Sequence, residues 1–223
     1  MVFLYEEKAG ERYLSLKGEH YKYLVKVRRH KVGDTLAFRQ KKDADILHTY
    51  IITEIAPRSL ELKKLDSKQY QVKAKKSLHV GWCIIDAKSV EKVLASLNEM
   101  GVESISFIYC ARSQKNFKVD FKRYERILEA SNQQCGRSDM MQFEVYKNLE
   151  KFLVDYPDVK VFDFTDKVLD STQSIQDVLI GCEGGFSPDE KLLLVQKDVF
   201  RLDTPLVLRS ESAVLAVAAK ILL

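Results

Sequence analysis

The sequence predicts an α/β protein built from two unlike parts. Between residues 1 and 70, short apolar runs separated by turn residues recur at regular spacing, a pattern typical of a small β-barrel or sandwich. From residue 71 to the end, strand-like and helix-like segments alternate, which favours a parallel sheet with helices on both faces. A lysine-rich stretch at 66–76 separates the two parts, so we expect domains at 1–70 and 71–223.

The first part is expected to be all strand. Gly18, the Val32–Asp34 stretch and Pro57 supply turn chemistry between apolar runs. The expected strands cover residues 13–18, 24–29, 34–40, 47–55 and 59–65.

The second part should alternate strands at 77–85, 104–110, 159–164 and 177–182 with helices at 89–101, 121–135, 148–157, 187–196 and 210–223. Helical spacing places two apolar sets on inner faces. They are Val90, Val93, Leu94, Leu97 and Met100, and Phe121, Tyr124, Ile127, Leu128 and Ser131. Gly101 is expected to end the first helix, and Ser187 with Glu190 forms a capping box at the start of another.

Composition indicates a globular cytoplasmic protein. Of 223 residues, 46% are hydrophobic and 30% charged, and no apolar run approaches the roughly 18–20 residues of a membrane span. The four cysteines are far apart without metal-ligand or disulfide spacing, so we expect reduced thiols and no metal site. The net charge of +4 is compatible with an anionic partner but does not by itself indicate nucleic acid.

Three glycines follow the expected strand at 177–182. The spacing of Gly181, Gly184 and Gly185 fits neither the dinucleotide fingerprint nor the phosphate-binding loop. Glycines at the carboxyl end of a parallel strand either let a ligand approach the backbone or make a tight turn. Glu183 favours the pocket, because a turn does not require a carboxylate there.

Three further clusters each leave two interpretations open. Arg209, Ser210 and Glu211 join a strand-like run to a helix, as part of a pocket or as a plain cap. Arg137 is either functional or a solvated cation at a helix end. Cations interleave with Tyr21 and Tyr23 in residues 20–34, which suits phosphate contacts and base stacking but equally a solvated strand face. The cations singled out are Lys22, Lys26, Arg28 and Arg29.

Taken together, these clusters resemble the ribosomal RNA small subunit methyltransferase E family of the SPOUT superfamily, whose members methylate N3 of a uridine in 16S rRNA. The most specific part is "IGCEGGFS" at 180–187, close to the family's Ile-Gly-Pro-Glu-Gly-Gly-Phe-Ser. "LRSESA" at 208–213 is similar to the family's Leu-Arg-Thr-Glu-Thr-Ala. "QCGR" at 134–137 matches the family's Gln-Cys-Gly-Arg. Cys182 replaces the family proline, and Cys110 and Ala111 replace Thr-Glu before Arg112.

The resemblance implies a PUA-like barrel over 1–70 and a SPOUT domain over 71–223 with a C-terminal trefoil knot. It also implies S-adenosylmethionine as cofactor, 16S rRNA in the small ribosomal subunit as partner, and a homodimer. The cofactor-binding residues would be Ile180, Gly181, Glu183, Gly184, Gly185, Leu208, Arg209, Ser210 and Glu211.

Methylation at N3 requires loss of the N3 proton, so we expect cations beside the uracil carbonyls and a general base. Arg112 and Arg137 are the candidate cations, and Glu183 or Glu211 the candidate base. The RNA would be held by Lys22, Lys26, Arg28, Arg29 and Arg137. The alternatives are methylation of another RNA site or a ribose 2′-hydroxyl, and RNA binding without catalysis.

Overall fold

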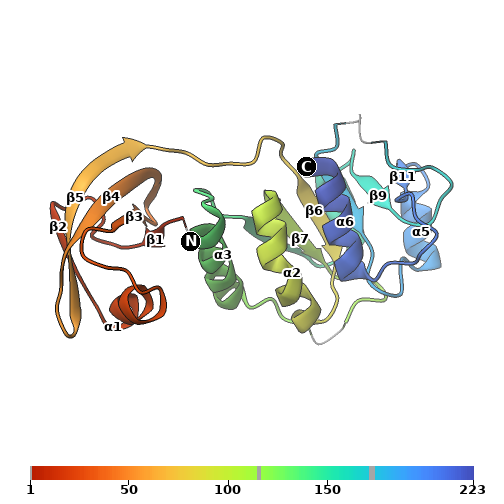
Figure 1. The fold of residues 1–223 in the computed structure, drawn as a ribbon. Coiled ribbons are helices and arrows are strands. Elements are labelled where there is room, and N and C mark those ends of the chain that lie inside the picture. The colour runs from red at the N-terminus through yellow and green to blue at the C-terminus, as the bar shows by residue number, and fades with distance from the viewer. Residues whose placement is uncertain (1, 115–116, 171–173) are drawn as a thin grey trace. The chain divides into compact units, whose positions relative to one another are not determined.

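A computed structural model describes residues 2–114, 117–170 and 174–223 of the chain. The chain divides into two compact units (Figure 1). The first comprises residues up to Lys73 together with 132–139, and the second comprises residues 74–131 and 140–223. Each unit has its own apolar core.

The first unit contains a five-stranded mixed sheet in the order β1-β3-β4-β5-β2. β1 runs parallel to β3, and the other neighbours are antiparallel. Register shifts interrupt the β3–β4 and β4–β5 pairings, and such bulges bend and twist strands. The strands are β1 (Leu4–Tyr5), β2 (Tyr13–Lys17), β3 (Thr35–Gln40), β4 (Asp43–Ile55) and β5 (Ser59–Gln69).

The expected strand at 24–29 is wrong. Residues in this region form a short helix, α1 (Gly18–Tyr21), followed by a π-helical segment, η1 (Lys22–Val27). Tyr21 and Leu24 are buried three residues apart while Val27 is 66% exposed, which is a helical spacing rather than strand alternation. The closely spaced apolar residues of "LVKV" therefore led to the wrong prediction of a strand.

The second unit is built on a six-stranded, all-parallel sheet in the order β11-β9-β10-β6-β7-β8. Four of its strands, β6, β7, β9 and β10, match the expected ones. The edge strands β8 and β11 were not expected. The strands are β6 (His79–Cys83), β7 (Ser104–Ile108), β8 (Gln142–Tyr146), β9 (Lys160–Phe162), β10 (Asp177–Ile180) and β11 (Val199–Phe200).

Helices cover both faces of this sheet, as the alternating pattern predicted. Gly81 faces α4 so closely that a Cβ there would lie 2.3 Å from the Phe152 ring. The next residue, Trp82, points to the opposite face and reaches Ser210 of α6. α2 and α6 lie side by side (Figure 1). The helices are α2 (Ala87–Met100), α3 (Phe121–Cys135), α4 (Leu149–Asp155), α5 (Pro188–Leu194) and α6 (Ser210–Leu222).

Local sequence signals explain where the helices begin and end. Asp86 caps α2, and Gly101 ends it with a positive φ of 98°. The predicted capping box between Ser187 and Glu190 is present at α5. On α3, Tyr124 and Leu128 are buried as expected, but Phe121 is 48% exposed. None of the helices in the described ranges is long and apolar enough to cross a membrane.

Candidate functional site

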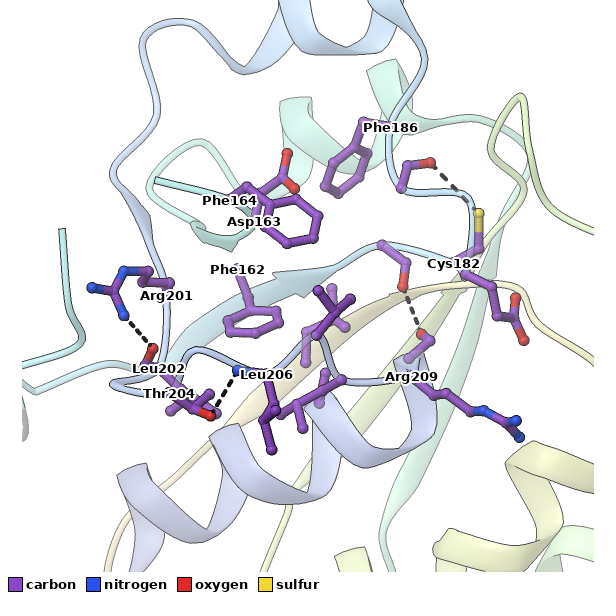
Figure 2. A pocket seen from close by; sticks show the side chains of 18 of the residues that line it. Phe162, Asp163, Phe164, Cys182, Phe186, Arg201, Leu202, Thr204, Leu206 and Arg209 are labelled. Atoms are coloured by element: carbon purple, nitrogen blue, oxygen red, sulfur yellow. Dashed lines mark hydrogen bonds between the residues drawn. The ribbon is translucent and has the colours of Figure 1, made fainter. Parts of the chain in front are cut away.

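A cavity of about 340 Å³ opens at the carboxyl edge of the parallel sheet (Figure 2). Its walls come from three loops that follow β9, β10 and β11 in the chain. Ligands of open α/β sheets bind at this edge, because the loops there converge from neighbouring strands. The size falls within the range of about 300–1,000 Å³ typical of small-molecule sites.

The cavity walls are mainly aromatic and aliphatic, with few polar groups. Figure 2 shows Phe162, Phe164 and Phe186 on one side and Leu206 on the other. Asp163 and Arg201 bring one negative and one positive charge to the same cavity. A flat heteroaromatic group with a polar, charged tail fits such a lining.

The loop after β10 is a tight turn held by its own backbone. The Gly185 N–H donates to the Cys182 carbonyl at 2.9 Å, and Gly185 has a φ of +63°, a region open to glycine at little cost. Cys182 lines the cavity while 6% exposed, and this burial raises the pKa of its thiol. The turn thus presents its backbone and the Glu183 side chain to the cavity.

Arg112 packs against this turn from the loop after β7. Its Nη1 donates to the Gly184 carbonyl. A Cβ on Gly184 would lie 3.1 Å from the Arg112 Cδ, so glycine allows this close approach. The hydrogen bond holds the Arg112 guanidinium at Gly184, whose two sequence neighbours, Glu183 and Gly185, both line the cavity.

One buried carboxylate ties the same two loops together. Glu190, which is 8% exposed, accepts from the Ala111 N–H at 2.7 Å through Oε1. Its Oε2 accepts from the Ser187 N–H at 2.8 Å, which completes the capping box of α5. The loop that carries Arg112 therefore has a fixed connection to the start of α5.

The start of α6 is connected to the turn after β10 by a side-chain hydroxyl. Ser210 Oγ donates to the Gly181 carbonyl at 2.6 Å and accepts from the Trp82 indole N–H at 2.8 Å. Ser210 and Gly181 both line the cavity. No group of three metal-ligating side chains occurs in the parts of the chain that the structure describes.

Comparisons with known proteins agree with this architecture. Residues 72–222 match the RNA methyltransferase domain family. The chain is 37% identical over 223 residues to the ribosomal RNA small subunit methyltransferase E of Helicobacter pylori, with 98% of each chain covered. This chain belongs to the ribosomal RNA small subunit methyltransferase E family.

Solved structures share the fold of the family. The ribosomal RNA small subunit methyltransferase E of Neisseria gonorrhoeae, solved bound to S-adenosylmethionine, superposes with a TM-score of 0.75 at 17% identity. The match covers 98% of this chain and 95% of that one. A Legionella pneumophila protein solved with bound SAM gives a TM-score of 0.74 at 20% identity, covering 97% and 96% of the two chains.

Most of the residues that the family resemblance assigns to the cofactor gather around the cavity. They are Ile180, Gly181, Glu183, Gly185, Leu208, Arg209 and Ser210. Gly184 contacts Arg112 instead of lining the cavity, and Glu211 does not line it either. One carboxylate oxygen of Glu211, Oε2, is buried without a hydrogen-bond partner among the described residues. Figure 2 shows the Arg209 side chain extending away from the aromatic wall.

Arg137 has a different setting from Arg112. It belongs to the first unit, is 5% exposed, and makes a bidentate ion pair with Asp139, with both N···O distances at 2.9 Å. A guanidinium held this way has two of its donors engaged by one carboxylate. Its assignment to catalysis and to substrate binding stays a prediction.

The other four predicted RNA-binding cations, Lys22, Lys26, Arg28 and Arg29, occupy exposed positions of η1 and the residues after it. Lys26 lies over the Tyr21 ring at 5.9 Å, and Arg28 lies over the Tyr23 ring at 5.5 Å and donates to its hydroxyl. Lys22 pairs with Glu19 at 2.9 Å, and Arg29 follows on the same segment. The interleaving of cations with aromatic rings is therefore realised on a helical surface instead of a strand.

Several cavity residues were missed by sequence reasoning. Phe162 ends β9, Asp163 and Phe164 directly follow it, and residues 201, 202 and 204–207 follow β11. The usable signal was their place after a strand, the same place that singled out Gly181. Trp82, which contacts Ser210 from outside the cavity, was also missed, because a tryptophan inside an apolar strand is typical of a core residue.

Proposed function

We propose that this chain transfers a methyl group from S-adenosylmethionine to N3 of a uridine in 16S rRNA of the small ribosomal subunit. The observation that carries the proposal is the three-loop cavity at the carboxyl edge of the sheet, lined by residues of the "IGCEGGFS" and "LRSESA" segments, which resemble the family's motifs. The full-length match to curated relatives named for this activity supports it.

The lining of the cavity fits the cofactor group by group. Phe162, Phe164 and Leu206 offer apolar surface for the adenine ring. The Asp163 carboxylate accepts hydrogen bonds, as ribose hydroxyls or an ammonium group require. The backbone of the turns at 181–185 and 208–210 supplies further donors and acceptors. When bound, S-adenosylmethionine supplies a methyl group activated by the adjacent sulfonium.

The protein's own contribution is to position groups and handle the N3 proton. Arg112 would lie beside the uracil carbonyls, where its charge stabilises the anion left when N3 loses its proton. Glu183, exposed at the cavity mouth, would accept that proton as general base. Arg137 is a second candidate cation for the substrate, and Glu211 is the alternative base.

The surface formed by Lys22, Lys26, Arg28 and Arg29 would hold the RNA through its phosphates and exposed bases. Contacts of this kind position an RNA without reading its sequence. Residues 1–70 would act as the PUA-like RNA-binding barrel and residues 71–223 as the SPOUT domain. We further propose that the C-terminal segment forms the trefoil knot, and that the protein is a cytoplasmic homodimer.

Methyl transfer can be tested with the purified chain, labelled S-adenosylmethionine and small ribosomal subunits from cells lacking the gene. We expect label in N3-methyluridine of 16S rRNA, identified by mass spectrometry of the nucleosides. Label in a 2′-O-methylated nucleoside would favour the ribose alternative. Cofactor-independent RNA binding without label would favour a binding protein.

A further inference from the structure

A chain of two hydrogen bonds runs from the central sheet to both cofactor loops. Trp82 lies on β6 directly beside Ile180 of β10, the residue before the glycine turn. Its indole N–H donates to Ser210 Oγ, and that hydroxyl donates to the Gly181 carbonyl. One buried side chain of the sheet thus connects the turn after β10 with the start of α6.

The hydroxyl of Ser210 is committed by these two bonds. A serine hydroxyl has one proton to donate, and Ser210 gives it to Gly181 at 2.6 Å. The indole N–H can only donate, so it fixes which way the hydroxyl points. Ser210 is 5% exposed and Trp82 is fully buried, so water cannot readily replace either partner.

We infer that Trp82 and Ser210 are positioning residues that set the spacing of the two loops that bind the cofactor. This inference rests on the proposed function, and it changes the role of Ser210. The Ser210 hydroxyl donates its proton to the Gly181 carbonyl and cannot also donate it to the cofactor. Trp82 does not line the cavity and acts through Ser210.

The setting of Trp82 suits this role. The ring is fully buried and packs beside Phe107 of the neighbouring strand at a centroid distance of 6.4 Å. Its place in the register opposite Ile180 puts the N–H next to the point where β10 ends. The loops, by contrast, depend on side-chain and turn contacts for their relative position.

The test measures S-adenosylmethionine affinity by calorimetry for the full-length chain and four variants: Ser210→Ala, Ser210→Thr, Trp82→Phe and the double variant Trp82→Phe/Ser210→Ala. Ser210→Ala should weaken binding about 5- to 30-fold, because both loops lose their connection. Ser210→Thr keeps the hydroxyl and should restore most of the affinity. Trp82→Phe should weaken binding alone but add little to Ser210→Ala, because both changes remove the same connection.

Additive losses in the double variant would overturn the inference, and so would a threonine variant as weak as the alanine one. Melting temperatures identify variants that merely unfold. Wild-type protein that fails to bind S-adenosylmethionine would overturn both the proposed function and the inference. Wild-type binding with unchanged affinity in Ser210→Ala would overturn the inference alone.

Discussion

At the scale of single residues, Gly184 and Gly185 of the turn after β10 lack a side chain for two different physical reasons. Gly185 has a left-handed φ of +63° with open space around the position of a Cβ. Gly184 has no positive φ, but a Cβ there would press on Arg112. The first glycine serves the backbone conformation, and the second serves the contact between two loops.

Replacing Gly185 with alanine should therefore cost about 1–2 kcal/mol of unfolding free energy through backbone strain. The strained turn should also bind S-adenosylmethionine more weakly. Gly184→Ala is the matched control, because it adds the same methyl group without strain in φ, and the Arg112 side chain can shift. Urea unfolding and cofactor titration of both variants would check this, and equal stability of the two would contradict it.

His79 sits at the opposite, amino edge of the sheet in a buried polar cluster. Its Nδ1 is 3.0 Å from Asp177 Oδ1 and its Nε2 is 2.8 Å from Ser106 Oγ, while the ring stacks on Tyr156. The arrangement has the order of a hydrolytic triad, but the Ser106 side chain is buried and no substrate can reach it. The cluster is therefore structural.

Burial lowers the pKa of His79, although the carboxylates of Asp177, Glu144 and Glu103 act in the opposite direction. Because the folded state binds the proton less readily than the unfolded state, stability is complete above the unfolded pKa of about 6.5 and falls as the pH drops below it. The wild-type unfolding free energy should decline more steeply than that of His79→Gln between pH 7 and pH 5. Parallel curves would contradict this.

At the scale of secondary structure, the start of α5 is hydrogen-bonded to the loop that carries Arg112. Glu190 accepts one backbone N–H from its own helix start and one from Ala111 on the loop of Arg112. The capping box was predictable from "SPDE", since its partners are three residues apart. The bond to Ala111 was not, because it joins residues 79 positions apart in the chain.

Glu190→Gln should remove one of these two acceptors, because an amide has a single oxygen. We expect a loss of about 1–3 kcal/mol in unfolding free energy, since a buried N–H is left unpaired, together with slower methyl transfer from a looser Arg112 loop. Asp189→Asn in the same first turn is the control, because Asp189 is exposed. Differential scanning calorimetry and a methylation assay would compare the two variants. Equal stability and equal activity of Glu190→Gln and Asp189→Asn would contradict the role of Glu190 in holding the Arg112 loop.

Periodic patterns explain which elements were predictable. The inner face of α2 and the buried strands β6, β7 and β10 follow from local spacing alone. The segment from residue 24 was mistaken for a strand because Leu24, Val25 and Val27 lie close together in the sequence, and which of them are buried depends on the packing of the first unit. Edge strand β8 was missed because Gln142 and Glu144 alternate with its apolar residues, so it lacks the continuous apolar run of a buried parallel strand.

The cavity was predictable only in part for the same physical reason. The turn at 181–185 and the residues 208–211 carry recognisable motifs. Phe162, Phe164 and Arg201 carry none, and they reach the cavity because strands distant in the sequence are neighbours in the sheet.

At the scale of the whole molecule, we propose that the first unit binds RNA and the second transfers the methyl group. Lys26→Ala with Arg29→Ala should weaken RNA binding and reduce the slope of log affinity against log salt by about 1–2, because each lost phosphate contact releases about one counterion fewer. Lys17→Ala with Lys63→Ala removes the same charge from exposed strand positions. Equal slopes of log affinity against log salt for the two double variants would contradict the assignment of η1 and the residues after it to the RNA interface.

The central claim is that this chain methylates N3 of a uridine in 16S rRNA, and nucleoside mapping in cells tests it most directly. Mass spectrometry of 16S rRNA from cells lacking the gene should show loss of N3-methyluridine, and the wild-type gene should restore it. An unchanged amount of N3-methyluridine, or the loss of a different modified nucleoside, would contradict the account.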